Sequence, residues 1–291
     1  MIVEILAIIA PVFICAAVGY GWARSGTPFD SNFVTALVMN ISAPCLIVGT
    51  LSTVDMPARH FSDIAIATLL VVALSLAVFS LLCRLFNWPL RTFLAPLSFP
   101  NTGNMGLPLA LFAFGDEGLA IALGMFMLMS MVHFSLGVAL LSGSSNGRVL
   151  FRSPIVYATL ISVMLVYTGA ALPAWLENTL NSLGGISIPL MLMTLGVSLQ
   201  RLQVGDALFS TGLAVARLGL GLAVGLLVVC LLDLEGVMRG VVIIQSAMPA
   251  AVFSYLLAHR YQRAPESIAG MVVISTLLGF LMLPAVLWLV L

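Results

Sequence analysis

The sequence predicts an all-α membrane protein of ten transmembrane helices, arranged as two inverted five-helix repeats in which helices 4 and 9 are broken and cross. Three observations predict this fold: the composition, the spacing of the apolar runs and two spans that prolines interrupt. Of 291 residues, 62% are hydrophobic and only 8% are charged, whereas an ordinary soluble domain carries about 25% charged residues. So few charges cannot cover a water-facing surface, so the lipid bilayer is the expected solvent. The net charge of zero gives no reason to expect a nucleic-acid partner.

Apolar runs recur along the whole chain, and each is close to the roughly 20 residues needed to cross a bilayer. The ten runs cover residues 3–22, 33–52, 63–86, 92–114, 117–141, 154–173, 177–199, 207–232, 237–259 and 266–290. The connectors between them are short, so we expect the function to lie within the membrane. The four cysteines stand singly in apolar runs, which predicts small buried side chains and neither a disulfide nor a metal site.

The arginines predict the orientation, because cytoplasmic loops carry an excess of basic residues. With ten spans, the connectors alternate between the two sides of the membrane. One side collects Arg24, Arg84, Arg91, Arg148, Arg152, Arg201, Arg260 and Arg263, and the other collects only Arg59 and Arg239. We therefore expect an integral protein of a plasma membrane (a bacterial inner membrane), with the first side in the cytoplasm and both termini outside.

The two halves of the chain share an ordered set of matches, which predicts a duplication. Ile41-Ser42-Ala43-Pro44 recurs as Ile186-Ser187-Ile188-Pro189. The predicted repeats cover residues 1–141 and 154–291, and a cytoplasmic linker at 142–153 joins them. Because each repeat has an odd number of spans, the two copies must lie in opposite orientations. Inverted repeats of this kind are typical of secondary transporters.

Two spans in corresponding positions are interrupted. The fourth contains PNTGNMGLPL at residues 100–109, and the ninth contains Pro249 among small residues. Proline removes a backbone donor and ends or kinks a helix. Two helices broken at mid-depth can cross, and their half-helix ends then face a cavity. Because the positive ends of half-helices attract anions, the pattern suits a carboxylate ligand. A plain proline kink is the alternative interpretation, more so for the ninth span than for the fourth.

The two interrupted spans resemble the auxin efflux carrier family, the PIN transporters of plants and their bacterial relatives. The resemblance rests on Pro100-Asn101-Thr102 followed by Met105-Gly106-Leu107-Pro108-Leu109, on Gln245 and Pro249 in the ninth span, and on Tyr261 at the end of that helix. It implies a scaffold of helices 1, 2, 6 and 7 and a moving transport part of helices 3–5 and 8–10. It also implies export of a weak-acid organic anion whose carboxylate contacts Asn101, and a homodimer formed through the scaffold helices.

The candidate substrate-binding residues are therefore Asn101, Thr102, Gly103, Asn104, Pro108, Gln245, Ser246, Pro249 and Ala250. Asn101 is placed to contact the ligand or to cap the second half-helix, and Asn104 to point into the cavity. Gln245 and Ser246 either add hydrogen-bond donors or bond to a neighbouring helix. Further candidates for lining the cavity from the scaffold are Ser42, Pro44, Ser187 and Pro189, for which simple helix bends are the alternative.

Two ionisable residues lie deep inside predicted spans, His133 in the fifth and Arg217 in the eighth. Such residues indicate a functional role by default because a charge is costly to bury in a membrane. Arg217 either takes part in coupling or donates hydrogen bonds to the carbonyls of a broken helix. His133 either couples transport to protons or, as the neutral imidazole, bonds to a neighbouring helix.

Every carboxylate falls near the end of a span or in a loop, whereas proton and sodium symporters usually place one at mid-depth. We therefore expect a potential-driven uniporter or exchanger of a small organic anion that works by alternating access. A proton- or sodium-coupled symporter and an anion channel are the alternatives. No catalytic residue, metal site or cofactor is expected, since the sequence has no HExxH helix and no nucleophile paired with a base.

Overall fold

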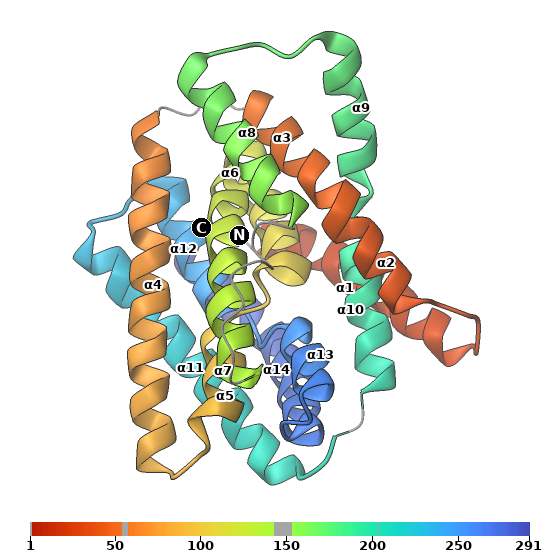
Figure 1. The fold of residues 1–291 in the computed structure, drawn as a ribbon, viewed down its shortest axis with the longest axis vertical. Coiled ribbons are helices and arrows are strands. Elements are labelled where there is room, and N and C mark those ends of the chain that lie inside the picture. Colours follow the sequence, from red (N-terminus) through yellow and green to blue (C-terminus); the bar gives the residue numbers. More distant parts are fainter. Residues whose placement is uncertain (1, 54–57, 143–152, 203) are drawn as a thin grey trace.

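The computed structural model describes residues 2–53, 58–142, 153–202 and 204–291 (Figure 1). These residues form helices and connecting loops, with one isolated pair of bridged residues and no extended strand. Seven of the helical segments are long and apolar enough to cross a membrane. The prediction of an all-α membrane protein is thus confirmed. Arg148, Arg152 and residues 143–152 of the predicted linker lie outside the described residues.

The helices follow one another with few long loops. The first half of the chain contains α1 (Ile2–Arg24), α2 (Ser31–Leu37), the π-helical turn η1 (Val38–Ser42), α3 (Ala43–Thr53), α4 (Ala58–Leu85), α5 (Leu90–Ser98), the π-helical turn η2 (Thr102–Gly106), α6 (Leu107–Val132), the π-helical turn η3 (His133–Gly137) and α7 (Val138–Ser142). The second half contains α8 (Pro154–Thr168), α9 (Ala174–Gly185), α10 (Ser187–Arg201), α11 (Ala207–Leu231), α12 (Gly236–Ala247), α13 (Val252–Arg260) and α14 (Pro265–Val290).

A sharp turn divides α6 into two helical pieces. At Gly115 the backbone has φ of +64° and ψ of −153°, a conformation that side chains exclude and glycine tolerates. The sequence predicts separate spans at 92–114 and 117–141, and this turn falls between them. α6 is therefore the second half of one predicted span followed by the start of the next.

Local sequence signals set several other helix ends. Asp30 caps α2 by accepting hydrogen bonds from the N–H groups of Asn32 and Phe33, each at 3.0 Å. Asp206 caps α11 through the N–H of Phe209 at 3.0 Å. These bonds satisfy N–H groups that have no partner inside a helix. At least these two carboxylates therefore serve helix ends.

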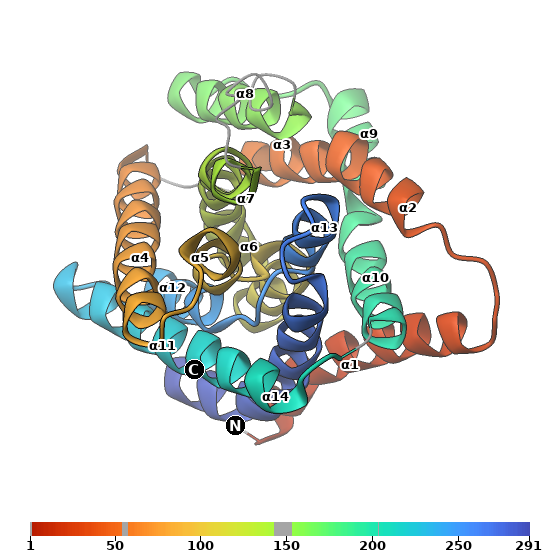
Figure 2. The same cartoon turned by 60° about the horizontal axis from the view of Figure 1, so that its bottom comes forward.

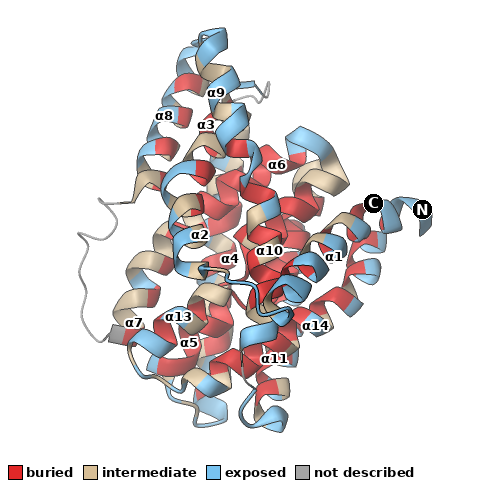
Figure 3. Ribbon diagram, turned by 90° about the vertical axis from the view of Figure 1, so that its right-hand side faces the viewer, coloured by how far each residue is buried: buried red, intermediate tan, exposed pale blue. Residues whose placement is uncertain are grey.

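The interrupted segments occupy the middle of the bundle. Figure 2 shows α5, α6 and α13 in the interior, surrounded by α1, α3, α4, α10, α11 and α14. Every residue of α5 from Thr92 to Ser98 and of α12 from Gly240 to Ala247 is buried, and the buried positions gather in this central part (Figure 3). By contrast, large apolar side chains such as Leu208 (86% exposed) and Leu281 (78% exposed) lie on the outside. Such an apolar exterior suits contact with lipid.

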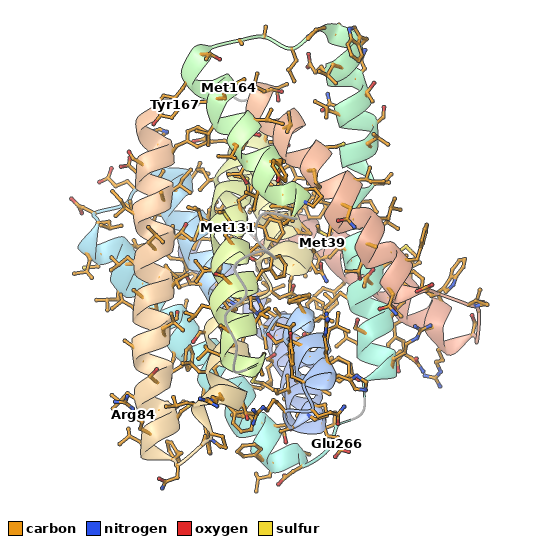
Figure 4. The ribbon with its side chains drawn as sticks, in the orientation of Figure 1. Met39, Arg84, Met131, Met164, Tyr167 and Glu266 are labelled. Carbon is orange, nitrogen blue, oxygen red and sulfur yellow. The ribbon has the colours of Figure 1, made fainter. Side chains whose placement is uncertain are left out.

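The outer helices pack closely through small residues. α1 lies along α10, and α3 lies against α8 and α9. A Cβ atom at Gly19 or Gly196 would overlap the backbone of the facing helix, so α1 and α10 approach more closely than larger residues would allow. The helix ends lie at opposite poles of the bundle: Arg84 and Glu266 at one end and Tyr167 at the other (Figure 4).

Candidate functional site

The two interrupted spans touch at their breaks. α5 ends at Ser98 and η2 begins at Thr102, while α12 ends at Ala247 and α13 begins at Val252. Between these helices the chain is extended, and the N–H of Asn101 donates to the carbonyl oxygen of Pro249 at 2.8 Å. The neighbouring Pro100 and Ala250 form an antiparallel bridge. Each break therefore satisfies part of the backbone that the other exposes, as a lipid environment requires.

One cavity of about 90 Å³ lies where the second half-helices begin. Its walls come from the second, fifth and seventh predicted spans and from both breaks. It is lined by Thr35, Val38, Met39, Pro100, Asn101, Thr102, Gly103, Asn104, Phe126, Ser130, His133, Phe134, Met191, Thr194, Ala251, Val252, Phe253 and Leu256. Figure 4 shows Met39 near the centre of the bundle, between the outer helices and the interrupted core. None of these described lining residues is acidic.

Asn101 lines the cavity, caps a helix and has a side-chain donor without a partner among the described residues. Its Oδ1 accepts a hydrogen bond from the N–H of Asn104 at 3.3 Å and so caps η2. Its Nδ2 is buried and has no hydrogen-bond partner among the residues that the structure describes. A buried donor without a partner costs about 1–3 kcal/mol. A ligand oxygen in the cavity would remove this cost.

His133 lies between the two breaks in an aromatic cluster. Its ring stacks on Phe99 with centroids 4.4 Å apart and planes 7° apart, and the edge-on ring of Phe253 lies 5.6 Å away. His133 Nε2 is buried and has no hydrogen-bond partner. His133 is thus a second cavity-lining residue with a polar nitrogen that no described residue satisfies.

The three π-helical turns of the described chain all reach this cavity. η1 contributes Val38 and Met39, η2 contributes residues 102–104, and η3 contributes His133 and Phe134. A π-turn widens the helix by one residue and is found frequently at functional sites. Their convergence is an independent indication that the cavity is the functional site.

Arg217 lies on the opposite side of the breaks, away from the cavity. It is 1% exposed and donates three hydrogen bonds to main-chain carbonyls. Nη1 bonds to the oxygen of Leu97 at 2.8 Å, Nη2 to that of Ser246 at 2.6 Å and Nε to that of Met248 at 3.3 Å. These carbonyls belong to the ends of α5 and α12, so one guanidinium joins both interrupted spans.

Some of the predicted site residues line the cavity, and others do not. Those on the cavity are Asn101, Thr102, Gly103, Asn104 and His133. Those that do not line it are Pro108, Gln245, Ser246, Pro249, Ala250 and Arg217. Gln245 is fully buried and packs against Gly106, where a Cβ would lie 2.1 Å from its Oε1. Gln245 therefore contacts the other interrupted span rather than the cavity.

The four scaffold candidates also lie away from this cavity. Ser42 and Ser187 hydrogen-bond to each other at 2.5 Å, and the Ser42 hydroxyl also lies 2.7 Å from the carbonyl oxygen of Leu183. Pro44 is partly buried on α3. Pro189 lines a different cavity together with Asn181. The second and seventh predicted spans reach the central cavity at other positions, Thr35 and Thr194 among them.

Several lining residues were not predicted from the sequence. Phe126 and Ser130 precede His133 at helical spacing, so they share its face. That spacing is the signal that would have found them once His133 was placed on the cavity. Ala251, Val252 and Phe253 carry no such signal, because apolar side chains fill most of every span.

The sequence is similar to those of known membrane proteins. A family model described as membrane transport protein matches residues 4–149 and 140–289. An uncharacterized transporter of Methanocaldococcus jannaschii is 28% identical over 202 residues, 66% of this chain and 65% of that protein, a little less than two thirds of its length. An uncharacterized transporter of Methanothermobacter thermautotrophicus is 27% identical over 274 residues, 88% of this chain and 87% of that protein.

Proposed function

The chain belongs to the membrane transport protein family, that of the PIN-like auxin efflux carriers, and on this premise we propose that it is a secondary transporter that exports a small organic carboxylate anion by alternating access. The resemblance to that family is confirmed by the match along both halves of the chain. The convergence of two half-helix N-termini on one cavity carries the proposal.

The electrostatics of this cavity favour an anion. A helix N-terminus carries about half a positive charge and unpaired N–H groups. The starts of η2 and α13 both line the cavity, so together they present about one positive charge to a bound group. Asn101 Nδ2 adds a free donor at the same place. A carboxylate would accept these hydrogens and balance this charge.

Alternating access requires one part of the molecule to move against another, and ten crossings in two inverted repeats would provide both parts. We assign residues 1–141 and 154–291 to the repeats and 142–153 to the cytoplasmic linker. Two features support this architecture. The Ser42–Ser187 hydrogen bond joins equivalent positions of the two matching motifs. The contact of α1 with α10 is mirrored by that of α3 with α8, as a two-fold axis between repeats would require.

In this arrangement helices 1, 2, 6 and 7 form the scaffold. Helices 3–5 and 8–10 form the transport part, which contains both interrupted helices and moves relative to the scaffold. Both termini lie outside the inner membrane, and the scaffold helices are available for a homodimer. The inside-negative membrane potential then drives export of an anion, by about 2.3 kcal/mol per charge for each 100 mV.

Counterflow in proteoliposomes tests the proposal. The probe is the labelled form of whichever of benzoate, succinate and N-acetylglutamate stabilises the purified protein most against heat. We expect saturable exchange with the unlabelled acid and faster uptake when valinomycin and K⁺ make the interior positive. Flux without saturation would indicate a channel. Flux that depends on Na⁺ and ignores the potential would overturn the uniport or exchange mechanism.

One observation favours proton coupling as a second candidate mechanism. His133 is the single ionisable side chain among the described lining residues, and its Nε2 has no partner. His133→Gln keeps a polar side chain that cannot titrate. If protons are coupled, a pH gradient drives net uptake of the labelled acid by the wild type and not by this variant. If they are not, both proteins respond to the potential alone.

A further inference from the structure

Arg217 holds the ends of two helices with one buried cation. Its guanidinium donates to carbonyl oxygens of Leu97, Ser246 and Met248 at 2.8, 2.6 and 3.3 Å. Its Cζ lies 5.6 Å from the ring centroid of Phe79, so an aromatic face covers part of the charge. All three acceptors are main-chain oxygens, and none is a carboxylate.

These carbonyls lie where the first half-helices stop. The last carbonyls of a helix have no partner within it, and the C-terminus carries about half a negative charge. The ends of α5 and α12 meet here, so together they present about one negative charge. A single guanidinium, which stays charged in proteins, balances that charge.

In other transporters with interrupted helices, a coupling cation binds at the C-terminal ends of half-helices. There, unwound carbonyls and half-helix C-termini coordinate Na⁺ or a proton. Carbonyl oxygens are ligands that hard cations accept readily. In this chain Arg217 on α11 already occupies the carbonyls that such an ion would need.

We propose that Arg217 is a tethered replacement for a coupling cation at the crossing of the two interrupted spans. It holds the C-terminal ends of α5 and α12 together, and it leaves the N-terminal ends of the second half-helices to face the cavity. This inference deepens the proposed transport function by making it independent of Na⁺. Arg217 is a positioning residue, since it does not line the cavity.

Thermal unfolding of the purified protein in detergent tests the wild type first. The midpoint is measured across concentrations of NaCl, KCl and choline chloride at constant ionic strength. We expect the same midpoint in all three salts, because the carbonyls are occupied. A ligand that binds only the folded state raises the midpoint in a saturable way. A saturable rise specific to Na⁺ in the wild type would overturn the proposal.

Substitution of Arg217 then vacates the position. In R217A we expect a lower midpoint that millimolar guanidinium or Na⁺ raises by several degrees, while equal concentrations of urea and choline do not. R217K keeps a tethered cation, so its midpoint should not respond to Na⁺. The matched control is R84A, because Arg84 is exposed at one pole of the bundle; its midpoint should stay at the wild-type value in every salt.

The outcomes separate the tethered cation from a merely structural side chain. If R217A responds to guanidinium no more than R84A does, the proposal is wrong. If R217A does not fold, R217Q replaces it, and a Na⁺ response of R217K contradicts the proposal on its own. None of these measurements uses an organic anion, so a failure to find an anionic substrate would leave their interpretation unchanged.

Discussion

The two faces of the crossing treat their helix ends in opposite ways. On one face, Arg217 donates to carbonyls of Leu97, Ser246 and Met248, so the C-terminal helix ends have a partner inside the protein. On the other face, the N-terminal ends line a cavity, and Asn101 Nδ2 has no partner. Both faces are made by the same pair of interrupted helices.

This difference teaches how a binding site can be built with few charged side chains. An interrupted helix exposes a negative end and a positive end at the same depth. If both ends were open, an ion at one would be opposed by the other. We propose that Arg217 closes the negative ends with a fixed cation, so that the positive ends alone are open to a ligand.

The largest expected effect is at the closed face. Arg217→Met removes the cation and leaves three buried carbonyls without their donor. Because hydrogen bonds to charged groups contribute about 1.5–3 kcal/mol each and are not additive, we expect a loss of at least about 3 kcal/mol in the free energy of unfolding. Titration with SDS in mixed micelles measures it. The exposed control Arg84→Met should change by no more than about 0.5 kcal/mol, and equal losses in the two variants would contradict the account of the closed face.

A smaller effect is expected where the two interrupted spans pack. A Cβ at Gly106 would lie 2.1 Å from Oε1 of the buried Gln245. Gly106→Ala should therefore lower the free energy of unfolding by about 1–3 kcal/mol through overpacking. Gly212 on α11 is the matched control, because nothing lies within 4 Å of its Cβ position. There alanine should stabilise the helix by about 0.5–1 kcal/mol. The same titration compares them, and a neutral Gly106→Ala would mean that the spans can slide apart at this contact.

A contact away from the crossing should matter less. The Ser42–Ser187 hydrogen bond joins α10 to the last residue of η1, directly before α3. Each single alanine variant should lose about 0.5–1.5 kcal/mol. In a double-mutant cycle the second substitution should cost little once the first is made, because the shared bond is already lost. Fully additive losses would show that the two hydroxyls do not depend on each other.

The smallest effect on stability is expected at the open face. Asn101→Asp keeps an oxygen that can cap Asn104, and its negative charge faces two positive helix ends. We expect a loss of less than about 1 kcal/mol in the unliganded protein. A loss above about 2.5 kcal/mol, the cost of a charge at mid-membrane, would mean that this face is not electropositive.

The sequence predicted the interruptions because proline cannot continue a regular helix, whatever the helix packs against. Pro100 and Pro249 both lie in the extended segments between helices, and the boundary between two predicted spans coincides with the turn at Gly115. The position of Asn101 directly after Pro100 also placed it at the break, and its Oδ1 caps η2 as one of the two predicted roles required. These features depend on the local chain alone.

The sequence did not predict which side of each break faces the cavity. Gln245 and Ser246 precede the second break and lie behind it, whereas the apolar Ala251 and Phe253 follow it and line the cavity. The orientation depends on how the spans cross, which no residue type encodes. The hydrogen-bond acceptors of Arg217 could not be predicted either. Every residue has a main-chain carbonyl, and only the three-dimensional structure shows that those of Leu97, Ser246 and Met248 lie within reach.

The most direct test of the account is whether the open face binds an anion. The thermal midpoint of the purified wild type and of Asn101→Asp is measured with benzoate, succinate and N-acetylglutamate, and with benzamide as a neutral counterpart of benzoate. We predict that at least one acid raises the wild-type midpoint in a saturable way, that benzamide does not, and that Asn101→Asp loses the response. The account is contradicted if no acid stabilises the wild type or if Asn101→Asp responds as the wild type does.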